Sequence, residues 1–237
     1  ATLKSKAHTV ESPFTWLHDD SGDDHQGVTE SSFFVDDVIS VLFIRCNFLD
    51  FPASPVSKAE LEADLNTVSG HLNTMSYRAA SLTSTVTTTL YTATESGTFY
   101  AQSGDNTALY NDVVAKYDAA PDANASSTYD VVGIYFPKLT EVANSIITYA
   151  GLGSVGGSRH WINGITSSYG RTRVITHEFG HNYGLYHSNY WDPTQEVGGT
   201  YRDPNASSLE YGDIFDCMGS GNLPDAHFNH YQKKKIN

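Results

Sequence analysis

The chain has few basic side chains. Among its 237 residues, Lys and Arg number 14 against 27 Asp and Glu, which gives a formal net charge of −13. Because phosphate backbones are bound by basic patches, this balance argues against nucleic acid binding. The basic run Lys233–Lys235 is interpreted as a solvated tail or helix face. Scarce Lys and Arg beside abundant Thr, Ser, Asn and Gly indicate an extracellular protein.

Long apolar runs are also missing. The longest, Val38–Ile44, is interrupted by Ser40 and is much shorter than the roughly 20 apolar residues that span a bilayer. We therefore predict no transmembrane segment. No signal peptide begins at Ala1, so a secreted protein would be represented here in a mature or trimmed form. The composition is that of a folded domain, which we expect to be a monomer, and the abrupt end at Asn237 is consistent with a truncated C-terminal part.

Cysteine is nearly absent. Only Cys46 and Cys217 occur, so a disulfide scaffold is excluded. Two alternatives remain open for this pair, which are a single bridge and two buried free thiols.

Hydrophobic periodicity predicts a mixed α/β fold. Ser57 and Glu60 form a capping box, and apolar residues follow it at helical spacing. Short runs rich in β-branched and aromatic residues are typical of buried strands. The predicted strands are Val38–Asn47, Ser81–Tyr91, Tyr129–Phe136 and an edge strand Arg159–Ile165; the predicted helices are 57–76, Ala108–Ala119, Arg173–Tyr186 and Phe228–Lys235. We predict one domain over 1–237, with a regular α/β lobe over 1–184 and an irregular C-terminal lobe over 185–237.

An acidic segment lies near the start of the chain. Carboxylates grouped around Gly22 are a candidate calcium site, because hard cations prefer oxygen ligands. The segment lacks the spacing and closing Glu of a known calcium loop, and a solvated acidic loop is the favoured interpretation. The carboxylates are those of Asp19, Asp20, Asp23 and Asp24.

The segment HEFGHNYGLYH, residues 177–187, has the spacing of a metal site. His177 and His181 stand at i and i+4, so a helix places both imidazoles on one face, one turn apart. Gly184 can end the helix in a left-handed conformation, which lets the chain turn and bring back His187. Three imidazoles leave one tetrahedral position open, which is typical of a catalytic zinc site.

This segment and the later EYGDIFDCMG, residues 210–219, resemble the metzincin zinc peptidases, and among them the gametolysin-like peptidases. The resemblance is specific over residues 174–219. It implies a twisted, mostly parallel sheet with backing helices and an active-site helix. It also implies that Met218 lies in a tight turn beneath the metal, the Met-turn, where its soft side chain makes an apolar floor. The activity implied is that of a secreted zinc endopeptidase acting on extracellular proteins or glycoproteins.

Within this resemblance, Glu178 is the candidate catalytic residue. It is expected to take a proton as water attacks the peptide carbonyl and to deliver it to the leaving amine. The substrate is expected along the sheet edge near Trp161 and Asn163, by backbone pairing; a core role for Trp161 is an equal alternative. Some metzincins have a tyrosine two residues after the methionine. Here that residue is Ser220, so Tyr211 is a candidate for the oxyanion or for the cleft wall.

Two other functions compete with the peptidase. One is a metal-stabilised binding or adhesion module without catalysis, against which Glu178 argues, because structure alone needs no carboxylate there. The other is a zinc amidase acting on cell-wall peptides, which uses the same metal chemistry on a different bond.

Overall fold

The structure is a computed structural model that describes residues 38–121, 123–192, 207–220 and 226–236. The acidic segment with Asp19, Asp20, Asp23 and Asp24 lies outside the described residues, so both the favoured solvated loop and the alternative calcium site stay predictions. Among the helices in these ranges, none has both the length and the apolar character needed to cross a membrane.

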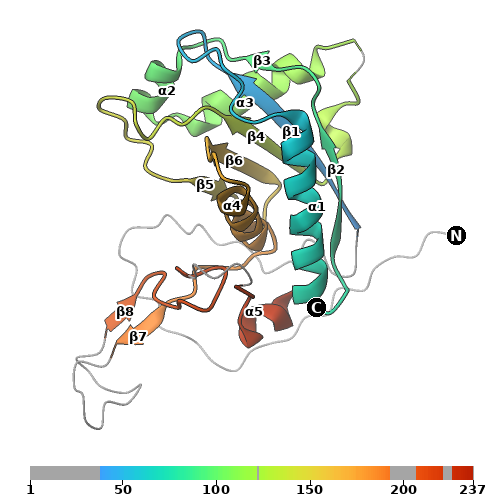
Figure 1. Ribbon diagram of the computed structural model, residues 1–237, viewed down its shortest axis with the longest axis vertical. Coiled ribbons are helices and arrows are strands. Elements are labelled where there is room, and N and C mark those ends of the chain that lie inside the picture. Colours follow the sequence, from blue (N-terminus) through green and yellow to red (C-terminus); the bar gives the residue numbers. More distant parts are fainter. Residues whose placement is uncertain (1–37, 122, 193–206, 221–225, 237) are drawn as a thin grey trace, which may run out of the picture.

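A mostly parallel sheet forms the centre of the described structure (Figure 1). The strand order is β2-β1-β4-β6-β5, and the short β3 pairs with the end of β1. All pairs are parallel except β5 with β6. The predicted fold class, a mostly parallel sheet with backing helices, is therefore confirmed. The strands are β1 Val38–Asn47, β2 Ser81–Val86, β3 Tyr91–Thr92, β4 Val131–Phe136, β5 Gly151–Gly153 and β6 Arg159–Asn163.

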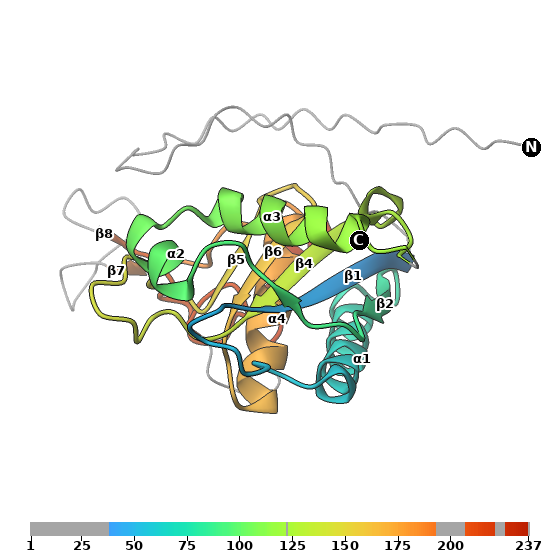
Figure 2. The ribbon, with the colours of Figure 1, turned by 90° about the horizontal axis from the view of Figure 1, so that it is seen from above.

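Helices cover both faces of this sheet. Figure 2 shows α1 (Lys58–Met75) and α4 (Ser168–Asn182) on one face, with α2 (Gly97–Ser103) and α3 (Asn106–Asp118) on the other. Burial on both faces explains why β1 and β4 are continuous apolar runs. A 3₁₀ turn, Ser126–Thr128, precedes β4.

The core has one apolar layer on each side of the sheet, because side chains alternate along β1. Val41 and Phe43 join the cluster beneath α1 and α4, whereas Leu42 and Ile44 join the cluster beneath α2 and α3. In α1, the residues predicted at helical spacing are all buried: Leu61, Leu65, Val68 and Leu72. The sequence pattern therefore identified the buried face of α1 correctly.

A buried ion pair joins α1 to the first turn of α4. The Asp64 carboxylate accepts from Arg171 Nε and from Ser168 Oγ, and both charged residues are buried. Arg171 Nη1 also donates to the Thr166 carbonyl at 2.7 Å. Because these partners satisfy both charges, the pair fixes how α4 lies against α1.

The edge of the sheet differs from the prediction. The strand Arg159–Asn163 is not at the edge, because β5 pairs antiparallel with it and takes the outer position among the described strands. The segment around β5 is glycine-rich and only Leu152 separates its two glycines, so it has no apolar alternation to indicate a strand. The predicted strand Ser81–Tyr91 is likewise two separate strands, β2 and β3.

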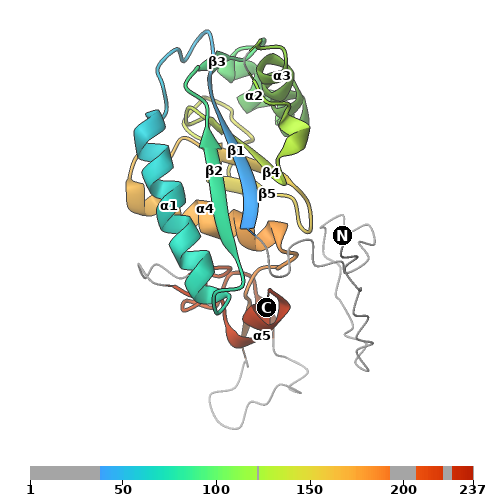
Figure 3. The same ribbon diagram turned by 90° about the vertical axis from the view of Figure 1, so that its right-hand side faces the viewer.

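The region after α4 has only short regular elements in its described parts. A two-stranded ribbon pairs β7 (Tyr190–Asp192) with β8 (Ser207–Leu209), and α5 (His230–Lys235) follows. Figure 3 shows α5 next to the end of α1. Cys46 and Cys217 are both buried and free, so of the two alternatives for the cysteines the structure has the free thiols.

Candidate metal centre

Helix α4 carries the two histidines of the helical pair. Its first turn is capped by Ser167, whose side chain accepts from Gly170 N–H at 3.1 Å, so the helix begins at Ser168, before the predicted Arg173. His177 and His181 lie one turn apart on it, with ring centroids 4.9 Å apart. The i, i+4 spacing therefore places both imidazoles side by side, as predicted.

The end of α4 is a tight left-handed turn at Gly184. Gly184 has φ 83°, its N–H donates to the His181 carbonyl at 2.8 Å, and Leu185 N–H donates to the Gly180 carbonyl at 2.9 Å. These two bonds form a Schellman motif, which needs a residue without a Cβ penalty at the left-handed position. The turn ends the helix at Asn182, before the predicted Tyr186, and the chain then returns along the face of α4 that carries the two histidines.

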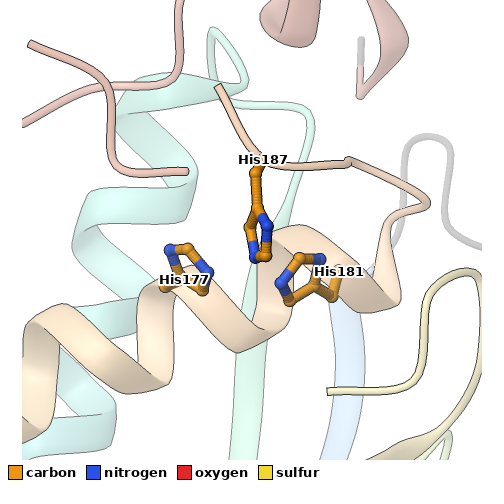
Figure 4. Close-up of side chains that lie close together, drawn as sticks. All are labelled: His177, His181 and His187. Carbon is orange, nitrogen blue, oxygen red and sulfur yellow. The ribbon is translucent and has the colours of Figure 1, made fainter. Parts of the chain in front are cut away.

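The returning chain brings His187 to the other two histidines (Figure 4). One ring nitrogen from each of the three histidines lies within 4.8 Å of the others. The ring centroid of His187 is 4.9 Å from that of His181 and 5.4 Å from that of His177. A tetrahedral zinc ion with Zn–N bonds of ~2.0–2.1 Å needs nitrogens about 3.4 Å apart, a spacing that lies within the 4.8 Å limit of this cluster.

All three imidazoles have their Nδ1 atoms engaged. His177 Nδ1 donates to the Cys217 carbonyl at 2.8 Å, and His181 Nδ1 to the Leu185 carbonyl at 2.8 Å. His187 Nδ1 faces Glu210 Oε1 at 2.7 Å. Because an acceptor at Nδ1 places the proton there, the Nε2 lone pair is left to bind a metal.

Electrostatics also favour neutral imidazoles. Burial lowers the pKa of His177 to about 3, with a further contribution from the nearby His181. Burial lowers the pKa of His181 to about 4. Neutral imidazole is the form that ligates zinc, so the residues present fit a zinc ion in both their donor atoms and their charge state.

Glu178 lies next to His177 on α4 and turns towards the edge strand β5. Its side chain is buried, and burial raises the pKa of its carboxyl group to about 8, although a hydrogen bond from Gly153 N–H acts in the opposite direction. A Cβ on Gly153 would come 2.6 Å from the Glu178 main-chain oxygen. The two glycines of β5 therefore allow the strand and the helix to approach closely.

Met218 lies in a turn beneath α4. It is fully buried, and a Cβ on Gly180 would collide with its sulfur. The turn is closed by Gly219 N–H donating to the Asp216 carbonyl at 3.0 Å, and Asp216 Oδ1 accepts from Met218 N–H at 2.7 Å. The Cys217 carbonyl of this turn accepts the hydrogen bond from His177 Nδ1, so the same few residues position Met218 and a candidate metal ligand.

Tyr211 is the candidate cleft residue that the structure brings to the histidines. Its ring centroid lies 3.7 Å from that of His187 and 6.0 Å from that of His177. Glu210, the residue before it, was not predicted. A lone acidic residue in an irregular segment has no spacing rule that would have linked it to His187.

Trp161 and Asn163 are not at an exposed edge. Trp161 is buried, packs against Tyr110 at a centroid distance of 5.1 Å and donates from its indole nitrogen to Asn106 O at 2.9 Å. Asn163 bonds to Leu139 N and Tyr149 O. Of the two alternatives for Trp161, the structure has the core role, and neither residue lies at the sheet edge, because β5 covers the strand that carries them.

A parallel-sheet protein with three convergent histidines on and after one helix has the features of a zinc metallopeptidase. The model of the Peptidase M66 family matches residues 64–221, well over half of the chain, and the protein belongs to this family. The match covers all three histidines and Glu178, and it confirms the metallopeptidase family that the resemblance to gametolysin-like peptidases indicated.

Two solved structures are distantly similar. One is described as the structure of a chaperone-substrate complex, with 12% identity and a TM-score of 0.39; the match covers 85% of this chain but only 34% of that one. The other is the crystal structure of a zinc-dependent peptidase from Methanocorpusculum labreanum, with 11% identity, a TM-score of 0.38, and coverage of 84% of this chain and 100% of that one. No curated protein matches the sequence.

Proposed function

We propose that the protein is a secreted zinc-dependent endopeptidase of the metzincin type, with His177, His181 and His187 as its metal ligands. The observation that carries the proposal is the convergence of three imidazoles whose Nδ1 atoms all have acceptors. A purely structural zinc site closes all four positions with protein ligands, whereas the three histidines leave one position for substrate chemistry. Membership of a peptidase family supports the same reaction.

Glu178 is the general base and acid in this proposal. When bound, zinc would supply a Lewis acid that polarises the scissile carbonyl and makes water more acidic. The chain's own contribution is a carboxylate on the helix that carries two of the proposed ligands, and desolvation raises the pKa of this carboxyl group. A raised pKa makes the carboxylate a stronger base for the proton of the attacking water, and the resulting acid can return that proton to the leaving amine.

The peptide substrate would lie along β5. This strand is the outer member of the described sheet, and its Gly153 N–H already contacts the Glu178 carboxylate. An extended peptide that adds to this edge would therefore have its backbone next to the proposed base. Protein and glycoprotein chains are both candidate substrates, because edge pairing recognises the backbone before the side chains.

The remaining assignments concern the turn beneath α4, the cleft and the location of the protein. Met218 would act as the Met-turn residue, which its burial against Gly180 supports. Tyr211 would form part of the cleft wall. One catalytic domain over 1–237, a monomeric state and secretion complete the proposal, and the low content of Lys and Arg supports an extracellular location.

The test is cleavage of casein or gelatin by the zinc-loaded protein, with and without a chelator, for the wild type and for Glu178→Ala. The wild type should cleave only with metal, and Glu178→Ala should keep its zinc and lose most activity. Near-normal cleavage by this variant would refute the role of Glu178. A wild type that binds zinc and cleaves cell-wall fragments but no protein would favour an amidase, and one that cleaves neither would favour a binding module.

A further inference from the structure

The third histidine is held differently from the other two. His177 and His181 belong to α4, and their Nδ1 atoms donate to main-chain carbonyls of Cys217 and Leu185. His187 lies outside the helix, and its Nδ1 partner is a side chain, Glu210 Oε1, at 2.7 Å. The hydrogen bond at His187 Nδ1 therefore comes from one exposed side chain that a substitution can remove.

The neighbouring residue contacts the same imidazole. The Tyr211 ring lies over His187 with a centroid distance of 3.7 Å and an interplanar angle of 35°. Glu210 thus fixes the ring edge through a hydrogen bond, while Tyr211 restricts the ring face. Together they leave the imidazole little freedom about either of its side-chain torsions.

An unusual backbone conformation allows two successive side chains to reach one ring. In an extended strand, neighbouring side chains point to opposite sides. Tyr211 has φ 58°, in the left-handed region that non-glycine residues rarely adopt, so the alternation that begins in β8 is broken here. Such conformations cost on the order of 1–3 kcal/mol and persist only where the surroundings impose them.

Hydrogen bonds on both sides impose this conformation. Tyr211 N–H donates to Asn189 Oδ1 at 3.2 Å, and the Tyr211 carbonyl accepts from Ser220 N–H at 2.8 Å. The Gly212 N–H donates to the Leu209 carbonyl at 3.0 Å, which closes the turn after β8. The segment is thereby tied both to the residues after His187 and to the residues after Met218.

We propose that Glu210 and Tyr211 form a clamp that holds His187 in its ligating position, so that this segment outside α4 sets the affinity of the site for zinc. The clamp rests on the proposed function, because it takes His187 as the third ligand. Both residues act through His187 and are positioning residues. Partners of ligating histidines typically change metal affinity by about 10–100-fold when they are removed.

Zinc affinity of the metal-free protein, measured by competition with a chromogenic chelator, tests the clamp. Glu210→Ala should weaken zinc binding by about 10–100-fold, and Glu210→Gln should weaken it less, because the amide oxygen still accepts from Nδ1. Tyr211→Ala should also weaken binding, whereas Tyr211→Phe, which keeps the ring, should stay close to the wild type. Glu141→Gln, which removes another exposed carboxylate far along the chain, is the matched control and should bind zinc as the wild type does.

Two further measurements separate positioning from folding and from catalysis. The melting temperature of the metal-free protein should be unchanged in the Glu210 variants, because the carboxylate is exposed, and the visible spectrum of the cobalt-substituted protein should change in Glu210→Ala. Wild-type affinity and an unchanged cobalt spectrum in Glu210→Ala would overturn the clamp. The clamp and the peptidase proposal fail separately: a wild type that binds zinc tightly but cleaves nothing would contradict only the peptidase.

Discussion

The close approach of β5 to α4 gives a quantitative prediction for the catalytic step. Gly151 and Gly153 both face Glu178, but a methyl group would meet different obstacles at the two positions. At Gly151 the new Cβ would fall 2.5 Å from Val174 Cγ1 and would overlap the Glu178 carboxylate, so side chains must move. At Gly153 it would fall 2.6 Å from the Glu178 main-chain oxygen, so the strand or the helix must move.

The required displacement can be estimated from these distances. Ordinary contacts of a Cβ begin at 3.4 Å, so a contact of 2.5 Å is relieved by a movement of roughly 1 Å. At Gly151 the obstacles are side-chain atoms of Glu178 and Val174 and not main-chain atoms, so the carboxylate is among the groups that must shift. A 1 Å misplacement of a catalytic group costs about 10²-fold in rate, or about 2.7 kcal/mol in the barrier.

Gly151→Ala should therefore lower kcat by about 100-fold while KM and zinc content stay near the wild-type values. Gly153→Ala should lower kcat and also destabilise the fold by about 1–3 kcal/mol, as overpacking does. Steady-state kinetics on zinc-loaded protein and urea unfolding measure these effects. Gly70→Ala is the control, because nothing lies within 4 Å of its Cβ and Gly70 is exposed in α1. A kcat for Gly151→Ala within about threefold of the wild type, at full zinc content, would refute this account of how Glu178 is positioned.

Three other predictions concern stability and metal. Asp64→Ala should lower the free energy of unfolding by about 3–5 kcal/mol, because it leaves the Arg171 charge buried without its partner. In urea unfolding, the double variant Asp64→Leu/Arg171→Met should be much closer to the wild type. Equal losses of stability in the single and the double variant would contradict this explanation. Met218→Ala should lower the free energy of unfolding by about 2–5 kcal/mol, and Met218→Leu by less than about 1.5 kcal/mol, because Met218 is fully buried. An alanine variant as stable as the wild type would show that the turn packs loosely. Removal of zinc by a chelator should lower Tm, because the ion binds only the folded site. The decrease in Tm should become smaller as free zinc is restored. A Tm that does not depend on zinc would argue against the site.

Local spacing made much of the metal centre predictable. The positions of His177 and His181 on one helical face follow from 3.6 residues per turn, and the helix end at Gly184 follows from the need for a left-handed residue. These are short-range rules, so a single sequence is sufficient to apply them. The capping box at Ser57 and the buried face of α1 were predictable for the same reason.

Long-range contacts could not be predicted in this way. The Nδ1 partner of His187 is Glu210, 23 residues further along the chain, and only the folded chain brings the two together. The edge position of β5 was missed because two of its three residues are glycine, which gives no periodic signal. Assignment of the edge to Arg159–Ile165 then placed Trp161 and Asn163 in a cleft, whereas they belong to the core.

The central claim is that His177, His181 and His187 bind one zinc ion together. X-ray absorption fine structure at the zinc edge of the protein loaded with one equivalent of zinc tests this claim most directly. The account predicts three imidazole nitrogens at ~2.0–2.1 Å and no sulfur ligand, with one imidazole fewer in His187→Ala. A sulfur ligand, fewer than three imidazoles in the wild type, or an unchanged spectrum in His187→Ala would contradict it.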